Sequence, residues 1–259
     1  MDFDLLTTII ISNWHIILLF FVVAILYSSV GFGGGSSYLA ILALTGIIYT
    51  QVRSTALLCN IIVVIGNVIL FQKQKLYNWN KVMPLVLFSI PLAFIGGYLQ
   101  ISQTFFFILL GLTLFFAAIT MWISKRIISK DDTAKDLSLV KNASYGGFIG
   151  FISGMVGIGG GIFLAPLLHL THWDIPKKIA ATASFFILVN SASGLIGQYT
   201  NPDFIIDWNL TSILLVTVFI GGQIGSRIST TFFTPTQLKK ATAILIAFVS
   251  LRILLKYLF

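Results

Sequence analysis

Eight uninterrupted apolar runs, each about long enough to cross a lipid bilayer, dominate this chain of 259 residues. A helix rises about 1.5 Å per residue and a bilayer core is about 30 Å thick, so roughly 20 apolar residues span it. We therefore expect an all-α polytopic membrane protein. The runs cover approximately residues 9–29, 54–71, 82–99, 104–123, 143–156, 180–199, 210–226 and 240–258.

The composition supports a membrane environment. The chain is 57% hydrophobic and 9% charged, with a mean hydropathy of +0.99, whereas soluble proteins carry roughly 25% charged residues. Long continuous runs favour helices over the alternating strands of a membrane barrel. The net charge of +8 then indicates basic loops beside a lipid bilayer, and we expect no nucleic-acid partner.

Two glycine clusters with the same spacing break the apolar pattern. The sequence "GFGGG" begins at Gly31, and "GIGGG" begins at Gly157. Each cluster precedes an apolar run too short to span a bilayer, residues 36–48 and 162–172. We predict two half-helices that start from glycine turns at membrane depth.

The two halves of the chain also share other motifs in the same order. "WN" occurs at residues 79–80 and 208–209, and "FIGG" occurs at residues 94–97 and 219–222. We predict a first transmembrane repeat over 1–123, a cytoplasmic linker over 124–142 and a second repeat over 143–259. About ten segments, five in each half, make the two repeats inverted with respect to the membrane. The oligomeric state stays open.

The positions of the charged residues predict an orientation. With the acidic N-terminus outside, cytoplasmic loops carry 13 of the 16 lysines and arginines. The loop over 200–209 contains two aspartates and no base, so it falls outside. Basic loops favour the cytoplasmic side, and this enrichment sets the expected orientation. We expect a multi-pass protein of the bacterial inner membrane.

Inverted repeats with interrupted helices are typical of secondary transporters, whose sites lie between the repeats. A helix that begins at mid-membrane offers unpaired N–H groups and the positive end of its dipole to an anion. The alternative is that the clusters are small-residue stripes for helix packing. We favour a backbone anion site. Its candidate residues are Gly33, Gly34, Gly35, Ser36, Gly159, Gly160 and Gly161.

Polar side chains within the apolar runs extend this candidate site. Asn60 lies in the third run, and Thr182, Asn190 and Ser191 lie in the matching run of the second half. Intramembrane polar groups commonly face the interior of a helix bundle, where they bind a ligand or join helices. We expect these residues to orient the oxygens of a bound anion.

Two further residues are candidates for coupling or gating. Arg53 precedes the third run; it could attract or gate an anion, or be a solvated arginine at a helix end. His169 lies on the second short run and could carry a proton or be a packing residue.

The acidic residues narrow the function further. All eight are aspartates, and none falls in the middle of a spanning run, which argues against a carboxylate-based carrier of cations. No motif indicates a metal site, a cofactor or a catalytic pair, so we expect neither cofactor nor enzymatic activity.

Four stretches resemble the sulfite exporter TauE/SafE family of membrane permeases. One departure is that Ala40 stands where Pro166 occupies the equivalent place of the second half. The resemblance implies transport of a small sulfur-containing anion, such as sulfite or an organosulfonate. The alternatives are a passive anion channel and a non-transporting interaction or assembly protein. The stretches are "GFGGGSSYLAIL" (31–42), "GMVGIGGGIFLAPLL" (154–168), "ATASFFILVNSASGLIGQY" (181–199) and "FIGGQIGSRIS" (219–229).

Overall fold

The described part of the chain is entirely helical. The structure is a computed structural model that describes residues 3–29, 31–123, 138–202, 204–228 and 235–258. Ten helices and no strand occur within these ranges. The helices are α1 (Phe3–Ser29), α2 (Gly35–Ala43), α3 (Tyr49–Lys73), α4 (Trp79–Tyr98), α5 (Gln103–Ile123), α6 (Leu139–Val156), α7 (Gly161–Leu170), α8 (Pro176–Tyr199), α9 (Trp208–Ile228) and α10 (Pro235–Leu258).

Six of these helices, α1, α3, α4, α5, α8 and α9, are long and apolar enough to cross a membrane. By contrast, α2 and α7 have only 9 and 10 residues. The expected pair of short helices after the glycine clusters is therefore present. Most of the linker predicted over 124–142 lies outside the described residues.

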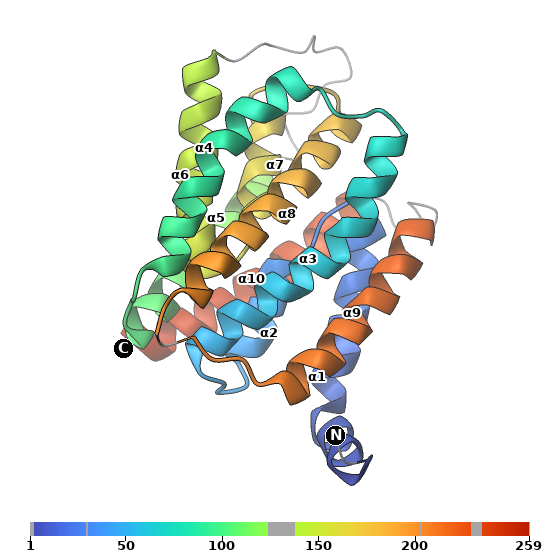
Figure 1. The fold of residues 1–259 in the computed structure, drawn as a ribbon, viewed down its shortest axis with the longest axis vertical. Helices are drawn as coiled ribbons and strands as arrows, with labels where there is room; N and C mark the ends of the chain where they lie inside the picture. The colour runs from blue at the N-terminus through green and yellow to red at the C-terminus, as the bar shows by residue number, and fades with distance from the viewer. Residues whose placement is uncertain (1–2, 30, 124–137, 203, 229–234, 259) are drawn as a thin grey trace.

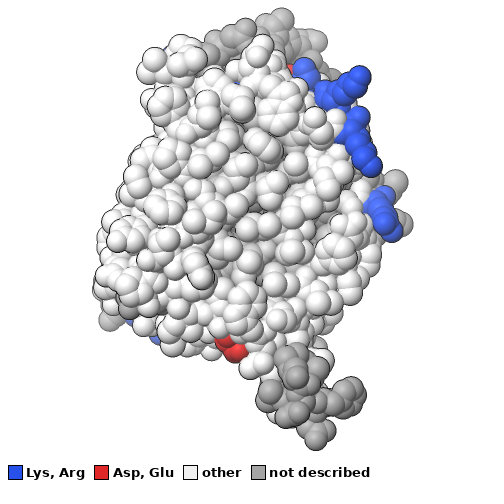
Figure 2. Space-filling view, viewed as in Figure 1, with Lys and Arg blue, Asp and Glu red and all other residues white. Residues whose placement is uncertain are grey.

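The helices form an elongated bundle with both chain ends toward its lower end (Figure 1). The connection between α3 and α4 lies at the upper end, and that between α8 and α9 at the lower end. Lys and Arg side chains gather along one side of the upper end, and an acidic side chain is exposed near the lower end (Figure 2). On the face shown, the charged side chains therefore lie toward the two ends of the bundle.

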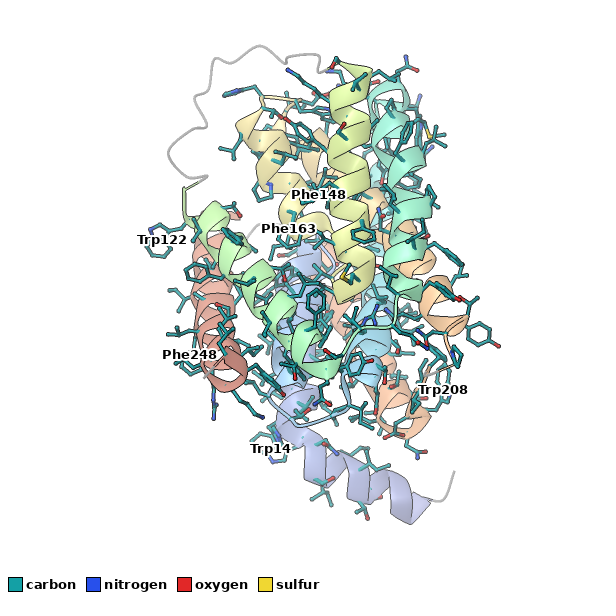
Figure 3. The ribbon with its side chains drawn as sticks, turned by 90° about the vertical axis from the view of Figure 1, so that its left-hand side faces the viewer. Trp14, Trp122, Phe148, Phe163, Trp208 and Phe248 are labelled. Atoms are coloured by element: carbon teal, nitrogen blue, oxygen red, sulfur yellow. The ribbon has the colours of Figure 1, made fainter. Side chains whose placement is uncertain are left out.

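The outer surface of the bundle is apolar. Large side chains such as Trp122, Phe148 and Phe248 are 61%, 68% and 61% exposed and lie on the outside of the helices (Figure 3). Acyl chains can cover such a surface, whereas water would leave it poorly solvated. The exposed apolar belt is what a membrane-embedded bundle requires.

Helix packing crosses between the two halves of the chain. In the first half, α4 packs on α6 and α8; in the second, α9 packs on α1 and α3. The central helices α3 and α8 pack on each other, as do α5 and α10. The same partners recur when equivalent helices of the two halves are exchanged.

Glycines allow the closest of these helix contacts. On α6, a Cβ built on Gly146, Gly150 or Gly154 would overlap the backbone of α4. These three glycines follow one another at four-residue spacing, so they form one stripe along the helix. This stripe is a packing surface.

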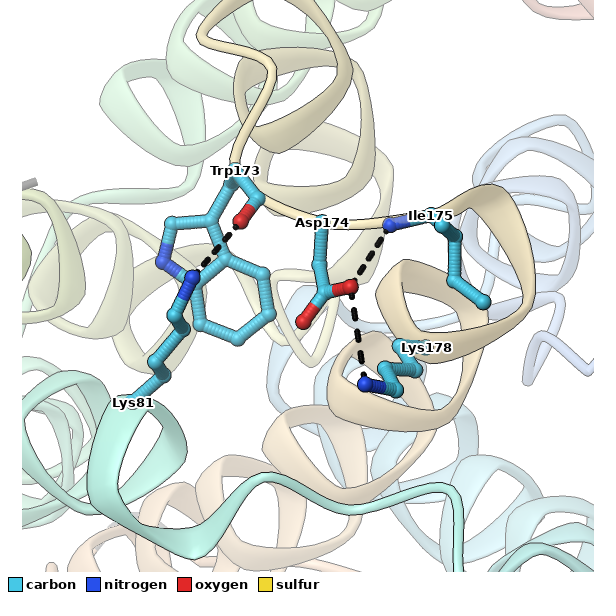
Figure 4. A network of polar contacts seen from close by, with 5 residues as sticks. All are labelled: Lys81, Trp173, Asp174, Ile175 and Lys178. Atoms are coloured by element: carbon cyan, nitrogen blue, oxygen red, sulfur yellow. Dashed lines mark hydrogen bonds and ion pairs between the residues drawn. The ribbon is translucent and has the colours of Figure 1, made fainter. Parts of the chain in front are cut away.

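A polar network joins α4 to the α7–α8 connection (Figure 4). Lys81 of α4 donates to the carbonyl oxygen of Trp173 over 3.2 Å, and its Nζ lies 5.6 Å from the centre of the indole ring. The carboxylate of Asp174 accepts from the N–H of Ile175 and pairs with Lys178 at 3.8 Å. The indole Nε1 of Trp173 donates to Asn142 Oδ1 of α6 at 3.2 Å. The buried Trp173 thus links α4, α6 and the α7–α8 connection.

Candidate anion site at the glycine turns

The first glycine of each cluster ends a long helix. Gly31 follows α1 and Gly157 follows α6, both with a φ of 86°. The N–H of Phe32 donates to Tyr27 O at 2.8 Å, and that of Ile158 donates to Ser153 O at 3.2 Å. Each bond reaches back five residues, as in a Schellman cap, whose left-handed position glycine occupies without strain.

The last glycines of each cluster start a short helix. Gly34 and Gly160 precede α2 and α7 with φ values of 85° and 82°, and no side chain caps either helix. Because the first N–H groups of a helix lack acceptors, they carry the positive end of its dipole. At these two turns, eight N–H groups make no hydrogen bond within the described structure, those of Gly33, Gly34, Gly35, Ser36, Gly159, Gly160, Gly161 and Ile162.

The two turns meet at Asn60. This residue is the twelfth of the 25 in α3, so it lies near the middle of that helix, and it is fully buried. Its Nδ2 donates to Ile158 O of the second turn at 2.9 Å. A Cβ built on Gly33 of the first turn would lie 2.6 Å from Asn60 Oδ1. The asparagine therefore contacts both turns at mid-bundle.

The turns also contact each other directly. A Cβ built on Gly35 would lie 2.5 Å from the carbonyl oxygen of Ile158. A side chain at this position would separate the turns, so glycine is needed for their close approach. The expected glycine residues are thus brought together in space.

The second half of the chain contributes two serines from α8. Ser184 Oγ donates to Gly31 O of the first turn, and a Cβ built on Gly159 of the second turn would lie 2.7 Å from Ser191 Oγ. These serines are seven residues apart, hence on one face of α8. Ser184 was missed among the expected site residues; its heptad spacing from Ser191 was the available signal.

Several buried polar atoms near the turns lack a partner within the described structure. Asn60 Oδ1 and Ser191 Oγ are both buried and make no hydrogen bond. A buried polar atom without a partner costs about 1–3 kcal/mol. A bound ligand is one means of satisfying both atoms.

The other expected polar residues have different surroundings. Asn190 Nδ2 donates to Ser89 Oγ of α4 at 3.0 Å and to Phe186 O at 2.8 Å, so it joins two helices. Thr182 is buried, and its Oγ1 also lacks a partner. It precedes Ser191 by nine residues, about two and a half turns, which places it on the opposite face of α8.

The candidate coupling residues lie away from the turns. His169 is partly buried in the last turn of α7, eight residues and thus about 12 Å along the helix from Gly161. Arg53 is 3% exposed, so the solvated alternative is wrong. Its Nη2 donates to Gly154 O, Gly97 O and Gly96 O at 3.2, 3.3 and 3.4 Å. In the described part of the chain, no cluster of three His, Cys, Asp or Glu could hold a metal ion.

The family follows from comparison with known sequences. The profile described as "Sulfite exporter TauE/SafE" matches residues 16–253, nearly the whole chain. This chain belongs to the sulfite exporter TauE/SafE family. The match includes both glycine turns, Asn60 and the two serines of α8. No solved structure matches the chain.

Three relatives carry names that describe transport. The probable membrane transporter protein y4hK of Sinorhizobium fredii is 31% identical over 91% of this chain and 95% of its own length. The probable membrane transporter protein YunE of Bacillus subtilis is 27% identical over 70% of this chain and 72% of its own. The probable membrane transporter protein MJ0441 of Methanocaldococcus jannaschii is 27% identical over 71% of this chain and 72% of its own length.

Proposed function

We propose that this protein is a secondary transporter for a small anion, sulfite or an organosulfonate. One observation carries the proposal: two helix N-termini, each with four unbonded N–H groups, meet at the buried Asn60. Membership of the TauE/SafE family and the transporter names of its relatives support a transport role. The sulfur chemistry rests on the family description.

The proposed site binds its anion mainly through the backbone. The N–H groups of Gly33 to Gly35 and of Gly159 to Gly161 supply donors, and the dipoles of α2 and α7 both favour negative charge. Ser191 Oγ adds a hydroxyl donor. Asn60 Oδ1 is an acceptor, so it suits an oxyanion that retains one O–H, such as hydrogen sulfite.

We propose that the two halves are inverted repeats that rock against each other. The crosswise packing of α4 on α6 and α8, and of α9 on α1 and α3, supports this relation. Asn60 of the first half binds the second turn, while Ser184 of the second half binds the first turn. A rigid-body movement of one half therefore changes the surroundings of both turns together.

The proposed orientation places the upper end of Figure 1 in the cytoplasm of a bacterial cell and the N-terminus outside. The basic side chains near that end (Figure 2) support it because cytoplasmic loops are enriched in Lys and Arg. His169 lies toward that end of α7, where a role in proton coupling stays a prediction.

Counterflow in proteoliposomes tests the function. Vesicles loaded with unlabelled sulfite should accumulate radiolabelled sulfite transiently, because a carrier exchanges substrate across the membrane. Methanesulfonate inside should drive the same uptake if organosulfonates are substrates. Sulfite flux without transient accumulation would indicate a passive channel. No flux of sulfite, methanesulfonate or sulfate would refute the anion-transport proposal and favour a non-transporting protein.

A further inference from the structure

A second polar site lies below the glycine turns, around Arg53. Nine residues line a small cleft between the first turn of α3 and the last turns of α4 and α8. None of the lining residues is acidic. They are Tyr49, Thr50, Arg53, Gly97, Leu99, Gln100, Gln198, Asn201 and Phe204.

Three hydrogen-bond donors in this cleft have no acceptor. Arg53 Nε, Thr50 Oγ1 and Gln198 Nε2 are each buried and unbonded within the described structure. Arg53 and Gln198 are only 3% and 5% exposed. All three residues line the cleft, and a group with several lone pairs would supply the acceptors that these donors lack.

The charge of Arg53 is only partly compensated. Its Nη2 donates to carbonyl oxygens in the last turns of α4 and α6, at Gly96, Gly97 and Gly154. A cation that caps the C-terminal ends of helices is favourable, and this role accounts for the hydrogen bonds of Nη2. It leaves Nε without an acceptor, and no carboxylate among the described residues pairs with this buried guanidinium. A buried charge without a counter-ion is costly, so an anion in the cleft would complete the site.

Gln100 and Asn201, which both line the cleft, make two hydrogen bonds that we call the latch. Gln100 Nε2 donates to Asn201 Oδ1 at 3.2 Å, and Asn201 Nδ2 donates to Tyr98 O at 3.0 Å. These bonds join the end of α4 to the end of α8. The free space in the cleft is roughly 10 Å³, enough for about one water-sized sphere, so an oxyanion can enter only when the latch is open.

The backbone of Arg53 packs against the second glycine turn. A Cβ built on Gly157 would lie 3.1 Å from the Cα of Arg53. Arg53, which lines the cleft, therefore lies beside the second turn in the bundle.

We propose that Arg53, Thr50 and Gln198 form a second oxyanion site, distinct from the glycine turns, which opens at the end of the bundle where α8 and α9 connect. The site takes a small singly charged oxyanion, whose oxygens accept from the guanidinium Nε, the hydroxyl and the amide. It loads the central site when the Gln100–Asn201 latch is open. The loading role rests on the proposed transport function, whereas binding itself does not.

Equilibrium binding of sulfite and methanesulfonate to the full chain in nanodiscs tests this site. Gln198→Leu and Thr50→Val each remove one donor and leave the hydrogen bonds of Arg53 Nη2 in place. We expect each variant to weaken anion binding at the cleft by at least about tenfold, with binding at the glycine turns unchanged. Arg53→Lys should do the same. Arg252→Gln, which removes an equal charge from an exposed position on α10, should leave binding unchanged.

Measurements in the Asn60→Leu variant distinguish binding at the cleft from binding at the glycine turns. Asn60→Leu should lower counterflow about tenfold to hundredfold yet retain binding at the cleft. The double variant Asn60→Leu/Gln198→Leu should lose that binding. Unchanged affinity in Gln198→Leu and Thr50→Val, or an equal loss in Arg252→Gln, would overturn the second site. Absence of counterflow in the wild type, together with anion binding at the cleft, would instead refute the transport proposal alone.

Discussion

Asn60 donates a hydrogen bond of 2.9 Å to the carbonyl oxygen of Ile158, 98 residues further along the chain. The bond joins the middle of α3 to the glycine turn that precedes α7. Since the same asparagine also lies against the first turn, it is the residue on which both halves of the chain converge.

Replacement of this asparagine should separate transport from folding. Asn60→Leu removes the bond to Ile158 and the acceptor Oδ1, and we expect sulfite counterflow to fall about tenfold to hundredfold. Asn67→Leu is the matched control, because Asn67 is equally buried on α3 but contacts Ser28 rather than the turns. Equal losses in both variants would assign Asn60 a purely structural role.

The contact between the turns should not tolerate a methyl group. Gly35→Ala places a Cβ 2.5 Å from Ile158 O, so the turns must separate and counterflow should be lost. Gly222→Ala places its Cβ 3.6 Å or more from Val63, an ordinary contact, and should transport normally. Full activity of Gly35→Ala would show that the close approach is dispensable.

The glycine stripe of α6 should govern stability instead. Gly150→Ala drives a Cβ to 2.6 Å from Ser89 O of α4, and we expect a loss of about 1–3 kcal/mol in the free energy of unfolding. Phe148→Ala, on the exposed face of the same helix, should change it little. Thermal unfolding in detergent compares the two variants.

The buried tryptophan at the upper end should couple to its amide partner. Trp173→Phe leaves Asn142 Oδ1 without its indole donor, at a cost of about 1–3 kcal/mol. The double variant with Asn142→Ala should cost less than the sum of the single changes, because the unpaired acceptor is gone. Strict additivity in thermal unfolding would show that the bond contributes nothing.

The proposed orientation is testable with a membrane-impermeant maleimide. Cys59 is fully buried, so the natural thiol should not react. Asn209→Cys introduces an exposed thiol at the lower end, and Lys75→Cys introduces one at the upper end. Intact cells should label Asn209→Cys and not Lys75→Cys; the reverse pattern would invert the proposed topology.

The sequence alone determined the helical class and the position of the short helices. Apolar runs of bilayer length leave few options, because a backbone in lipid must satisfy its own hydrogen bonds. The glycine clusters that begin at Gly31 and Gly157 likewise predicted turns before two short helices, because glycine weakens a helix and adopts a positive φ without strain. These are local properties, so a single sequence carries them.

The tertiary structure decided which polar residues share the site. Asn60 and Asn190 are similar by sequence, yet Asn60 lies between the turns and Asn190 binds Ser89 of α4. Arg53 lies at a helix start that the sequence permits to be solvated, but the ends of α4 and α6 enclose it. Such contacts depend on how helices that are distant in the chain are rotated and packed against one another. Hydropathy and residue spacing do not determine that packing.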